Sequence, residues 1–459
     1  MTALLESLVE AAATAAVQAR QGTVLHASGE MATATGLNLQ PRELAFIEDP
    51  AGRPLAVECA GASGSHSYLA LLDRGRVVPG SRVIAAGRTA SAPVGPSLLG
   101  RVLDGLGRPM DGAEEPRKVR WVSTHAEPPH PLERTPISES LETGVRAIDG
   151  LLTLGKGQRV GIFAGSGVGK STLLGMLARG TKADVTVIAL IGERGREVRD
   201  FIEHDLGLDA LQRCVVVAST GDNPAAMRIS AARTATSIAE AFRSEGNDVL
   251  LLFDSLTRVA MAQREIGLAA GEPPTTKGYP PSVFSMLPHL MERAGPAGHG
   301  SITAIYTVLV DGEDMDEPIA DLARATLDGH IVLKRSLASA GHYPPIDVLE
   351  SVSRLMDRVT VPRHSELARE MRQLLAAHAD SRDLISIGAY VRGSDPLVDN
   401  AIDLMPTLNV FLRQPPHEST PLEHSVLALE TIFGPESADG EEEPDDAYTA
   451  TVEAPREAA

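Results

Sequence analysis

Hydrophobic residues follow different spacings in successive stretches of the chain, and each spacing predicts a different kind of structure. Residues 3 to 20 (ALLESLVEAAATAAVQAR) are rich in alanine and place Leu4, Leu5, Leu8 and Val9 three and four positions apart. This spacing is typical of an amphipathic helix. We therefore predict an N-terminal helix over residues 1–21, which either packs on its own domain or docks onto a partner.

Between Gly22 and Leu99 the hydrophobic runs become short and resemble β-strands. Turns of Gly, Asp and Pro separate them at close spacing. Many short strands joined by tight turns are typical of a small antiparallel barrel. We predict such a barrel over residues 22–99, built from the runs TVLHA, LAFIED, LAVECA, YLALLD and SRVIAA.

The stretch from Ile137 to Arg358 alternates apolar runs with longer helical patterns. The apolar runs are continuous, as expected for parallel strands that are buried on both faces. This order of elements indicates an α/β domain with helices on both faces of a parallel sheet. Together with the linker rich in Gly and Pro that precedes it, the domain is predicted over residues 100–360. Its strands are predicted at RVGIFAG, VTVIALIGE, CVVVAS, DVLLLFDS, SITAIYTVLV and HIVLKRS.

The last part of the chain divides into a helical region and an acidic tail. The stretches HSELAREMRQLLAAHA and PLVDNAIDLMPTLNVFLRQ carry apolar residues three and four positions apart, which predicts a C-terminal helical domain over residues 361–434. Residues 435–459 are acidic and show no apolar periodicity. Such a segment buries too little apolar surface to fold, so we predict a disordered tail.

Composition limits the partners and the compartment. Lys and Arg number 42 against 61 Asp and Glu among 459 residues, a formal net charge of −19. A chain this acidic repels nucleic acid overall, so no nucleic-acid partner is expected. Cys59 and Cys214 match no metal-ligand spacing, the N-terminus lacks a signal-peptide pattern, and no apolar run approaches the roughly 18 residues that span a membrane. We therefore expect a cytoplasmic protein that associates with membranes only through partners.

One segment carries a nucleotide-binding pattern. The run RVGIFAG leads directly into AGSGVGKS, and the helical stretch TLLGMLAR follows. In this strand–loop–helix context, glycines turn backbone N–H groups toward phosphate oxygens and the helix presents its positive end to the same anion. Lys170 would reach the β- and γ-phosphates and Ser171 would ligate magnesium, so ATP and Mg²⁺ are the expected cofactors. The residues predicted to bind the nucleotide here are Gly165, Ser166, Gly167, Val168, Gly169, Lys170, Ser171 and Thr172.

This loop departs from the strict phosphate-loop pattern at its first position. Ala164 stands where the pattern has glycine. Alanine suffices there if its φ angle is negative. The dinucleotide-binding pattern fails, because its third glycine would fall on Lys170.

Two carboxylates and one arginine are candidates for the chemistry. Asp254 ends the run VLLLFDS and Glu193 follows VTVIALIG, so both would lie at the carboxyl edge of the sheet, where such sheets bind ligands. We expect Asp254 to hold magnesium or its water and Glu193 to orient the attacking water, although a surface ion-pair cluster would also explain Glu193. Hydrolysis also needs positive charge, and an arginine finger contributes about 10³ to 10⁵ in rate. Arg354 in SVSR is the candidate, but pattern alone does not choose it over its neighbours.

Several long stretches match a known family. They are GVRAIDGLLTLGKGQRVGIFAGSGVGKSTLLGML, ADVTVIALIGERGREVRDFIE, EPPTTKGYPPSVFSMLPHLMERAG, GSITAIYTVLVDGEDM and HYPPIDVLESVSR. With them the chain closely resembles the export ATPases of bacterial type III secretion systems, from about residue 95 to residue 413. That family is similar to the catalytic β subunit of rotary ATP synthases. The resemblance implies a RecA-like core and a homohexameric ring.

The resemblance also implies roles for single residues. Lys170 and Ser171 would bind phosphate and magnesium, Asp254 would serve the magnesium site, and Glu193 would position water. Arg194 would sense or contact the γ-phosphate.

Two further residues take roles from the same resemblance. Tyr343 would stack on the adenine ring, and Arg354 would reach into the site of a neighbouring subunit. The synthase subunit places a base-closing aromatic where this chain has Pro415 and Pro416. We therefore expect a more open pocket and weaker discrimination among bases.

The resemblance implies a function in protein export. The ring would hydrolyse ATP to assist export and to release substrates from chaperones. Its partners would be a stator or regulator protein, export chaperones and secreted substrates, and a membrane export gate at the inner membrane, reached through partners. The stretches RDLISIGAYVRGSDP and PPTTKGYPPSVF favour the flagellar branch, whereas DGEDMDEP leans toward injectisomes. We favour the flagellar system.

Three other functions compete with export. A rotary ATP synthase subunit would need a second chain at alternate ring positions, whereas this chain carries a full catalytic set. A ring-shaped RNA translocase would need aromatics in its barrel, but residues 22–99 contain only Phe46 and Tyr68. Glu193 and Arg354 together argue against a nucleotide-binding assembly protein without turnover.

Overall fold

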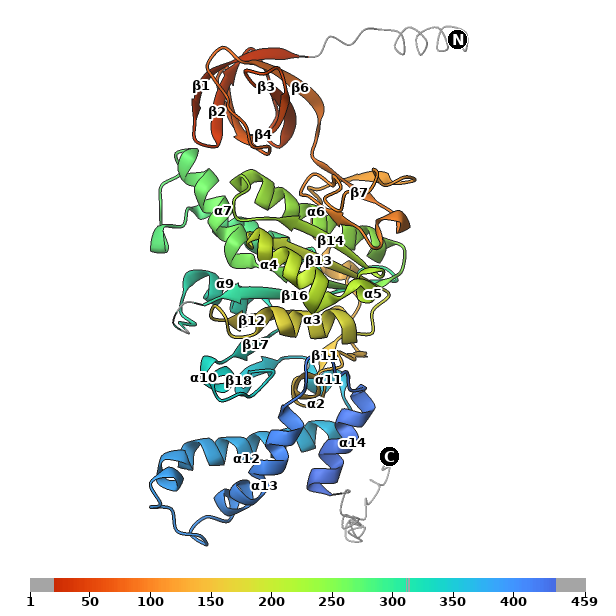
Figure 1. Cartoon of the computed structure of the whole chain (residues 1–459), viewed down its shortest axis with the longest axis vertical. Coiled ribbons are helices and arrows are strands. Elements are labelled where there is room, and N and C mark those ends of the chain that lie inside the picture. Colours follow the sequence, from red (N-terminus) through yellow and green to blue (C-terminus); the bar gives the residue numbers. More distant parts are fainter. Residues whose placement is uncertain (1–19, 311, 313, 435–459) are drawn as a thin grey trace, which may run out of the picture.

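A computed structural model describes residues 20–310, 312 and 314–434, and three parts follow one another along its long axis (Figure 1). A β-barrel lies at one end, an α/β domain in the middle and a helical region at the other end. All but two residues of the predicted N-terminal helix, and the whole predicted acidic tail, lie outside the described residues. No helix within the described ranges is long and apolar enough to cross a membrane.

The barrel is closed by antiparallel strands in the order β1-β2-β5-β4-β3-β6. Val24, Ile47, Val57, Leu69 and Val83 fill its interior. The predicted runs correspond to every strand except β2, whose sequence MATAT alternates small residues and lacks a strong apolar run. The strands are β1 (Gln21–Ser28), β2 (Met31–Thr35), β3 (Glu43–Glu48), β4 (Pro54–Ser63), β5 (His66–Leu71) and β6 (Arg82–Thr89).

The segment after the barrel forms small separate pieces of structure. Strand β7 (Ser91–Val94) pairs antiparallel with β9 (Arg120–Ser123), and β10 (Ser140–Leu141) pairs with β11 (Leu154–Gly155). The linker also contains the short 3₁₀ turns Pro96–Leu98 and Pro131–Glu133.

An eight-stranded sheet in the order β18-β17-β12-β16-β15-β13-β14-β8 forms the centre of the α/β domain. The six runs predicted as buried strands occupy its middle and pair in parallel, which confirms the predicted fold class. The prediction missed the two edge strands: β8 has only two residues, and β18 pairs antiparallel with β17. The strands are β8 (Val102–Leu103), β12 (Arg159–Ala164), β13 (Val185–Ile191), β14 (Cys214–Ser219), β15 (Asp248–Asp254), β16 (Ser301–Leu309), β17 (Gly329–Leu333) and β18 (Ile346–Ser353).

Helices cover both faces of this sheet, which explains why its central strands are apolar throughout. One face packs on α2 (Arg146–Leu151) and α3 (Lys170–Gly180). The other packs on α6 (Ala225–Ser244), α7 (Leu256–Ala269), α8 (Pro281–Glu292) and α9 (Pro318–Thr326). The shorter helical segments are α4 (Gly195–Asp200), a π-helical turn at Phe201–Leu206, α5 (Leu208–Leu211), the 3₁₀ turn Thr276–Gly278, α10 (Arg335–Ser339) and α11 (Met356–Val359).

The C-terminal region consists of α12 (Pro362–Ser386), α13 (Pro396–Leu412) and α14 (Leu422–Phe433). Helices α12 and α13 begin with proline, whose fixed φ suits the first helical turn. Asp395 caps α13 by accepting a hydrogen bond from the N–H of Leu397 at 2.9 Å. Leu367, Met371 and Leu408 join the hydrophobic cluster that contains α2 and α3, so these helices share a core with the α/β domain.

Candidate active site

The phosphate-binding loop connects β12 to α3 at the carboxyl edge of the sheet. Gly167 and Gly169 have φ angles of 74° and 104°, a backbone conformation that other residues rarely adopt. Ala164 ends β12 and is not among the residues with positive φ, so alanine fits the first position of the loop as expected. Val168 is buried under the loop, whereas Ser166 and Ser171 are exposed.

The two predicted carboxylates meet at Lys170. The Nζ of Lys170 lies 2.5 Å from Oδ1 of Asp254 and 3.3 Å from Oε1 of Glu193. This contact follows from the topology: β13 and β15 are neighbours in parallel register, so Asp254 at the end of β15 and Glu193 just after β13 lie at the same edge. The structure thus places Lys170, Glu193 and Asp254 in one cluster, with all three side chains at most 15% exposed.

Two further residues at this edge of the sheet were missed in the sequence analysis. The hydroxyl of Thr307, on β16, donates a hydrogen bond to Oδ1 of Asp254 at 2.6 Å. The side chain of Arg258 packs where a Cβ on Gly192 would lie, and its buried Nε has no hydrogen-bond partner among the described residues. Thr307 is one of several polar residues in the strand SITAIYTVL, so the sequence carried only a weak signal for it. Arg258 follows Asp254 by four residues and carried no comparable signal.

Burial and charge act against each other in the cluster. Burial disfavours the charged form of Lys170, but the charges of Asp254 and Glu193 outweigh it and raise the pKa of Lys170. Burial raises the pKa of Glu193; the charge of Lys170 partly offsets this, and the nearby charge of Asp254 adds to it. A carboxylate with a raised pKa is a better proton acceptor than an ordinary glutamate, which suits a group that activates water.

Arg194 lies outside this cluster. Its side chain is 86% exposed, and its Nη1 lies 3.3 Å from Oε1 of Glu197. Glu193 and Arg194 are neighbours in the sequence GERGRE, but their side chains separate. Glu193 contacts Lys170, whereas the guanidinium of Arg194 lies at the surface.

Tyr343 stands beside the phosphate-binding loop. A Cβ on Gly169 would lie 3.7 Å from a ring carbon of Tyr343, and the ring is partly exposed. The backbone carbonyl of Tyr343 accepts a hydrogen bond from the N–H of Gln414 at 2.9 Å. This bond brings the segment with Pro415 and Pro416 next to the tyrosine, so the predicted base pocket is assembled from two distant parts of the chain.

Arg354 lies at the opposite edge of the sheet. In β12 and β17, Ala164 pairs with Leu333 at the loop edge and Gly161 with His330 further back. Strand β18 runs antiparallel, so Ile346 pairs with Leu333 and Ser353 with Gly329. Arg354 follows Ser353 at the amino ends of the parallel strands and is exposed. It cannot share the site of Lys170 within one chain.

The residues present fit a magnesium ion that is held largely by nucleotide. No group of three or more His, Cys, Asp or Glu residues in the described part of the chain could hold a metal on its own. Mg²⁺ at phosphate sites takes one or two protein oxygens and completes its shell with phosphates and water. The exposed hydroxyl of Ser171, in the first turn of α3, and the carboxylate of Asp254 provide oxygens of this kind.

Comparisons with known proteins agree with this fold. Residues 144–353 match the model of the ATP synthase alpha/beta family, nucleotide-binding domain. Residues 360–431 match the model of the T3SS EscN ATPase C-terminal domain. Sheet, phosphate-binding loop and clustered carboxylates define a P-loop ATPase with the core of the ATP synthase α/β family.

Similar proteins identify the family within this class of P-loop ATPases. The chain is 52% identical over 427 residues to the flagellum-specific ATP synthase of Salmonella typhimurium, covering 90% of this chain and 94% of that one. It is 48% identical over 437 residues to the type 3 secretion system ATPase of Xanthomonas euvesicatoria, covering 94% and 98%. The assembled ATPase EscN from the type III secretion system of enteropathogenic E. coli superposes with a TM-score of 0.85 at 44% identity, over 90% of this chain and 100% of that chain. The chain belongs to the family of flagellum-specific and type 3 secretion system ATPases.

Proposed function

We propose that this ATPase works as a homohexameric ring that hydrolyses Mg-ATP to assist flagellar protein export, each site being shared by two subunits. The observation that carries the proposal is the separation of Arg354 from the Lys170 cluster by the length of the sheet. The phosphate-binding loop and Arg354, the candidate arginine finger, lie at opposite edges of the sheet. One chain can therefore complete its site only with the arginine of a second copy. The solved relative described as the assembled ATPase EscN supports an oligomer.

Within one subunit the residues divide the work. The loop N–H groups and Lys170 bind the phosphates, and the negative phosphate charge competes with Asp254 and Glu193 for the lysine. Mg²⁺ supplies neutralising charge when it is bound with nucleotide, and Ser171 and Asp254 are the residues that would hold it. Glu193 orients water and accepts its proton. The side chain of Arg258 packs against Gly192, the residue before Glu193.

The base is held more loosely than the phosphates. Tyr343 offers one partly exposed ring for stacking. Pro415 and Pro416 provide no second aromatic, although the segment lies next to Tyr343. We infer a pocket that accepts other purine nucleotides alongside ATP.

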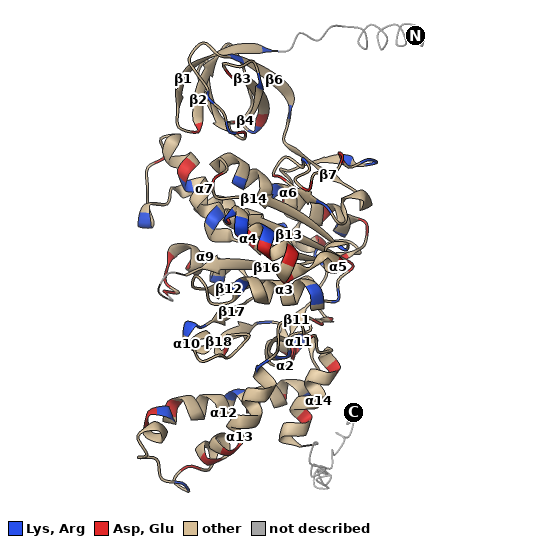
Figure 2. Cartoon of the chain, viewed as in Figure 1, with Lys and Arg blue, Asp and Glu red and all other residues tan. Residues whose placement is uncertain are grey.

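The export partners follow from the family. EscN was solved in complex with its central stalk EscO, which supports a stalk or stator partner for this chain as well. Release of substrates from chaperones and attachment to a membrane export gate are part of the proposal. Figure 2 shows few basic segments on the face of the barrel in view, which does not favour a nucleic-acid motor.

Experiments in cells test whether the protein serves flagellar export, and kinetics in solution test whether subunits share a site. Lys170→Ala in the source organism should abolish motility and flagellar filament export while the protein is still produced. Normal motility, with loss of an injectisome phenotype, would reassign the branch. In solution, turnover per molecule should rise with protein concentration as rings assemble. Constant specific activity far below the assembly threshold would contradict a shared site.

A further inference from the structure

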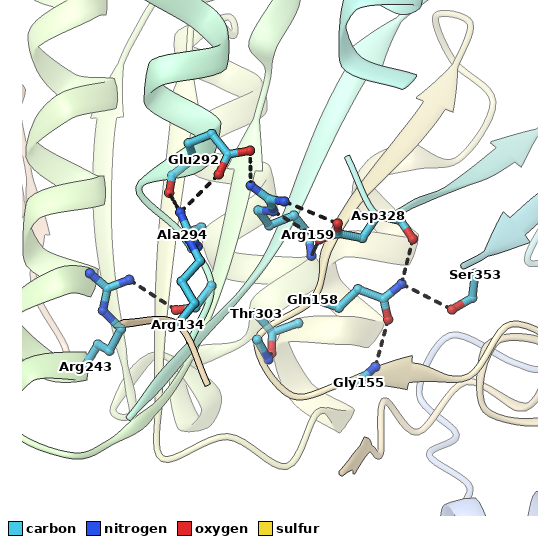
Figure 3. Close-up of polar contacts among 12 residues, drawn as sticks. Arg134, Gly155, Gln158, Arg159, Arg243, Glu292, Ala294, Thr303, Asp328 and Ser353 are labelled. Atoms are coloured by element: carbon cyan, nitrogen blue, oxygen red, sulfur yellow. Dashed lines mark hydrogen bonds and ion pairs between the residues drawn. The ribbon is translucent and has the colours of Figure 1, made fainter. Parts of the chain in front are cut away.

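A network of polar side chains at the amino edge of the sheet reaches Ser353, the residue before Arg354 (Figure 3). At its centre Arg159, the first residue of β12, forms a forked pair with Asp328. The Nε of Arg159 donates to Oδ2 at 3.0 Å and Nη2 donates to Oδ1 at 3.2 Å. The backbone N–H of Arg159 also donates to Oδ2, and the N–H of Asp328 donates to the carbonyl of Arg159 at 2.8 Å. Four hydrogen bonds thus fix Asp328 to the start of β12.

Gln158 ties Asp328 to the end of β18. Its side chain is fully buried, and Nε2 donates to the carbonyl of Asp328 at 3.0 Å and to the hydroxyl of Ser353 at 3.2 Å. The Oε1 atom accepts from the N–H of Gly155 at 2.8 Å. The hydroxyl of Ser353 donates to the carbonyl of Thr153 at 2.8 Å. The residue immediately before Arg354 is therefore held on two sides.

Arg354 itself rests on the segment that ends at Asp328. Its backbone N–H donates to the carbonyl of Asp328 at 3.1 Å. Its Nη2 donates to the carbonyl of Arg324, the helical residue four positions earlier, at 3.0 Å. Arg354 is nevertheless exposed. Main-chain carbonyls thus hold both the backbone N–H and the guanidinium of Arg354. An exposed guanidinium held in this way is suited to contact another molecule from a defined position.

The network extends to α8 through a second carboxylate. Nη1 of Arg159 lies 2.5 Å from Oε1 of Glu292, and Arg134 lies 3.0 Å from Oε2 of the same group. Arg134 also donates to the carbonyl of Ala294 at 2.8 Å. Burial disfavours the charge of Arg159, but Asp328 and Glu292 outweigh it and keep its pKa above the ordinary value. Ion pairs of this kind add little net stability compared with apolar packing, so their geometry is the more informative property.

We propose that Asp328 and Gln158 are positioning residues for Arg354, and that the Arg159–Asp328 pair sets where this arginine enters the site of the neighbouring subunit. The inference rests on the shared site proposed above. Neither side chain contacts the phosphate-binding loop of its own subunit, because each lies at the other end of β12. Their effect on turnover is therefore exerted on the neighbour's site and not on their own.

The first test is steady-state kinetics of Asp328→Ala. Misplacing a catalytic group by about 1 Å costs roughly 100-fold, so kcat should fall between about 10- and 100-fold while KM for ATP changes less than about twofold. Asp328→Asn, which keeps one of the two acceptor oxygens that Arg159 uses, should lose less. The control is Asp111→Asn, which weakens a similar forked pair with Arg101 at 2.6 and 3.0 Å, and it should retain wild-type turnover.

The second test is a double-mutant comparison. If Asp328 acts only through Arg354, adding Asp328→Ala to Arg354→Ala should cause no further loss. A double variant that loses the product of the two single effects would show an independent role for Asp328 and would overturn the proposal.

The third test mixes subunits. Asp328→Ala subunits keep an intact Lys170 site, whereas Lys170→Ala subunits keep an intact Arg354 and its supports. In a randomly mixed 1:1 ring, about a quarter of the interfaces would join the two intact halves, so activity should rise well above that of either variant alone. No rise would place the defect of Asp328→Ala in its own site and overturn the inference.

The same mixing separates this inference from the proposed function. Arg354→Ala subunits mixed with Lys170→Ala subunits should also regain activity. If that pair fails, the shared site is wrong and the positioning role is lost with it. If that pair recovers and the Asp328→Ala pair does not, the shared site stands and the positioning role alone is wrong.

Discussion

The two edges of the central sheet hold their functional residues in different ways. At the carboxyl edge, Lys170 is held by side-chain carboxylates, through ionic contacts with Asp254 and Glu193. At the amino edge, Arg354 is held by the main-chain carbonyls of Asp328 and Arg324. A bound phosphate can replace the carboxylates as the ionic partner of Lys170. The main-chain carbonyls that hold Arg354 are part of the fold and stay in place.

This difference matches the tasks of the two edges. A residue that binds substrate in its own subunit must exchange its partners during each cycle. A residue that enters a neighbouring site must arrive at a fixed position without adjusting there, because enzymes stabilise charge with groups that are already oriented. Variants at each edge test whether the two edges have these separate roles.

The largest expected effect is at the amino edge. Arg354→Ala should lower kcat by about 10³- to 10⁵-fold, the range found for arginine fingers, and leave nucleotide affinity nearly unchanged. Steady-state kinetics together with a direct nucleotide-binding titration would measure both. Arg358→Ala removes an exposed arginine four residues further on and serves as the control. A loss below tenfold for Arg354→Ala would remove the catalytic role from this edge.

The next effect is at the carboxyl edge. Glu193→Gln should lower kcat by about 10²- to 10⁴-fold, because the amide cannot accept the proton of water. The pKa of Glu193 is raised, so its ionised form is lost as the pH falls through a value above the ordinary glutamate range. The kcat/KM of the wild-type enzyme should therefore decline on the acid side.

Measurement of kcat/KM against pH tests this assignment. Glu203→Gln, at a surface pair with Arg199, should keep the wild-type profile. An acid limb that persists unchanged in Glu193→Gln would assign it to another group.

A smaller effect is expected at the base. Stacking on an aromatic ring is worth about 1 to 3 kcal/mol, so Tyr343→Ala should raise KM for ATP by roughly 5- to 150-fold with little change in kcat. Tyr343→Phe keeps the ring and should behave as wild type. Equal KM values for the alanine and phenylalanine variants would show that the ring does not contact the base. Comparison of ATP with GTP would also measure how open the pocket is.

The sequence predicted the carboxyl edge better than the amino edge for a physical reason. Glycines and Lys170 lie within eight consecutive residues, and Asp254 and Glu193 follow continuous apolar strands, so local patterns locate all of them. The parallel pairing of those strands then brings the carboxylates together without further information. The barrel and the central strands were predicted by the same local signals.

The supports of Arg354 could not be predicted in this way. Gln158, Asp328 and Ser353 come from three distant segments, and their contacts depend on β18 turning back antiparallel. Thr307 was missed because its hydroxyl faces Asp254 from a neighbouring strand. Arg194 illustrates the opposite case, since a residue adjacent to Glu193 in sequence has its side chain at the surface.

The smallest effect compares two threonines on β16, one near each edge. Thr307→Val removes the 2.6 Å hydrogen bond to Asp254, and Thr303→Val removes the acceptor of the N–H of Gly157 at 2.8 Å. Each lost bond should lower the free energy of unfolding by about 1 to 2 kcal/mol, measured by denaturant titration. Only Thr307→Val should also change ATP affinity, by a few-fold, because it frees Asp254 to bind Lys170 differently. If both variants changed ATP affinity equally, the carboxyl edge would not be the separate substrate-binding edge described here.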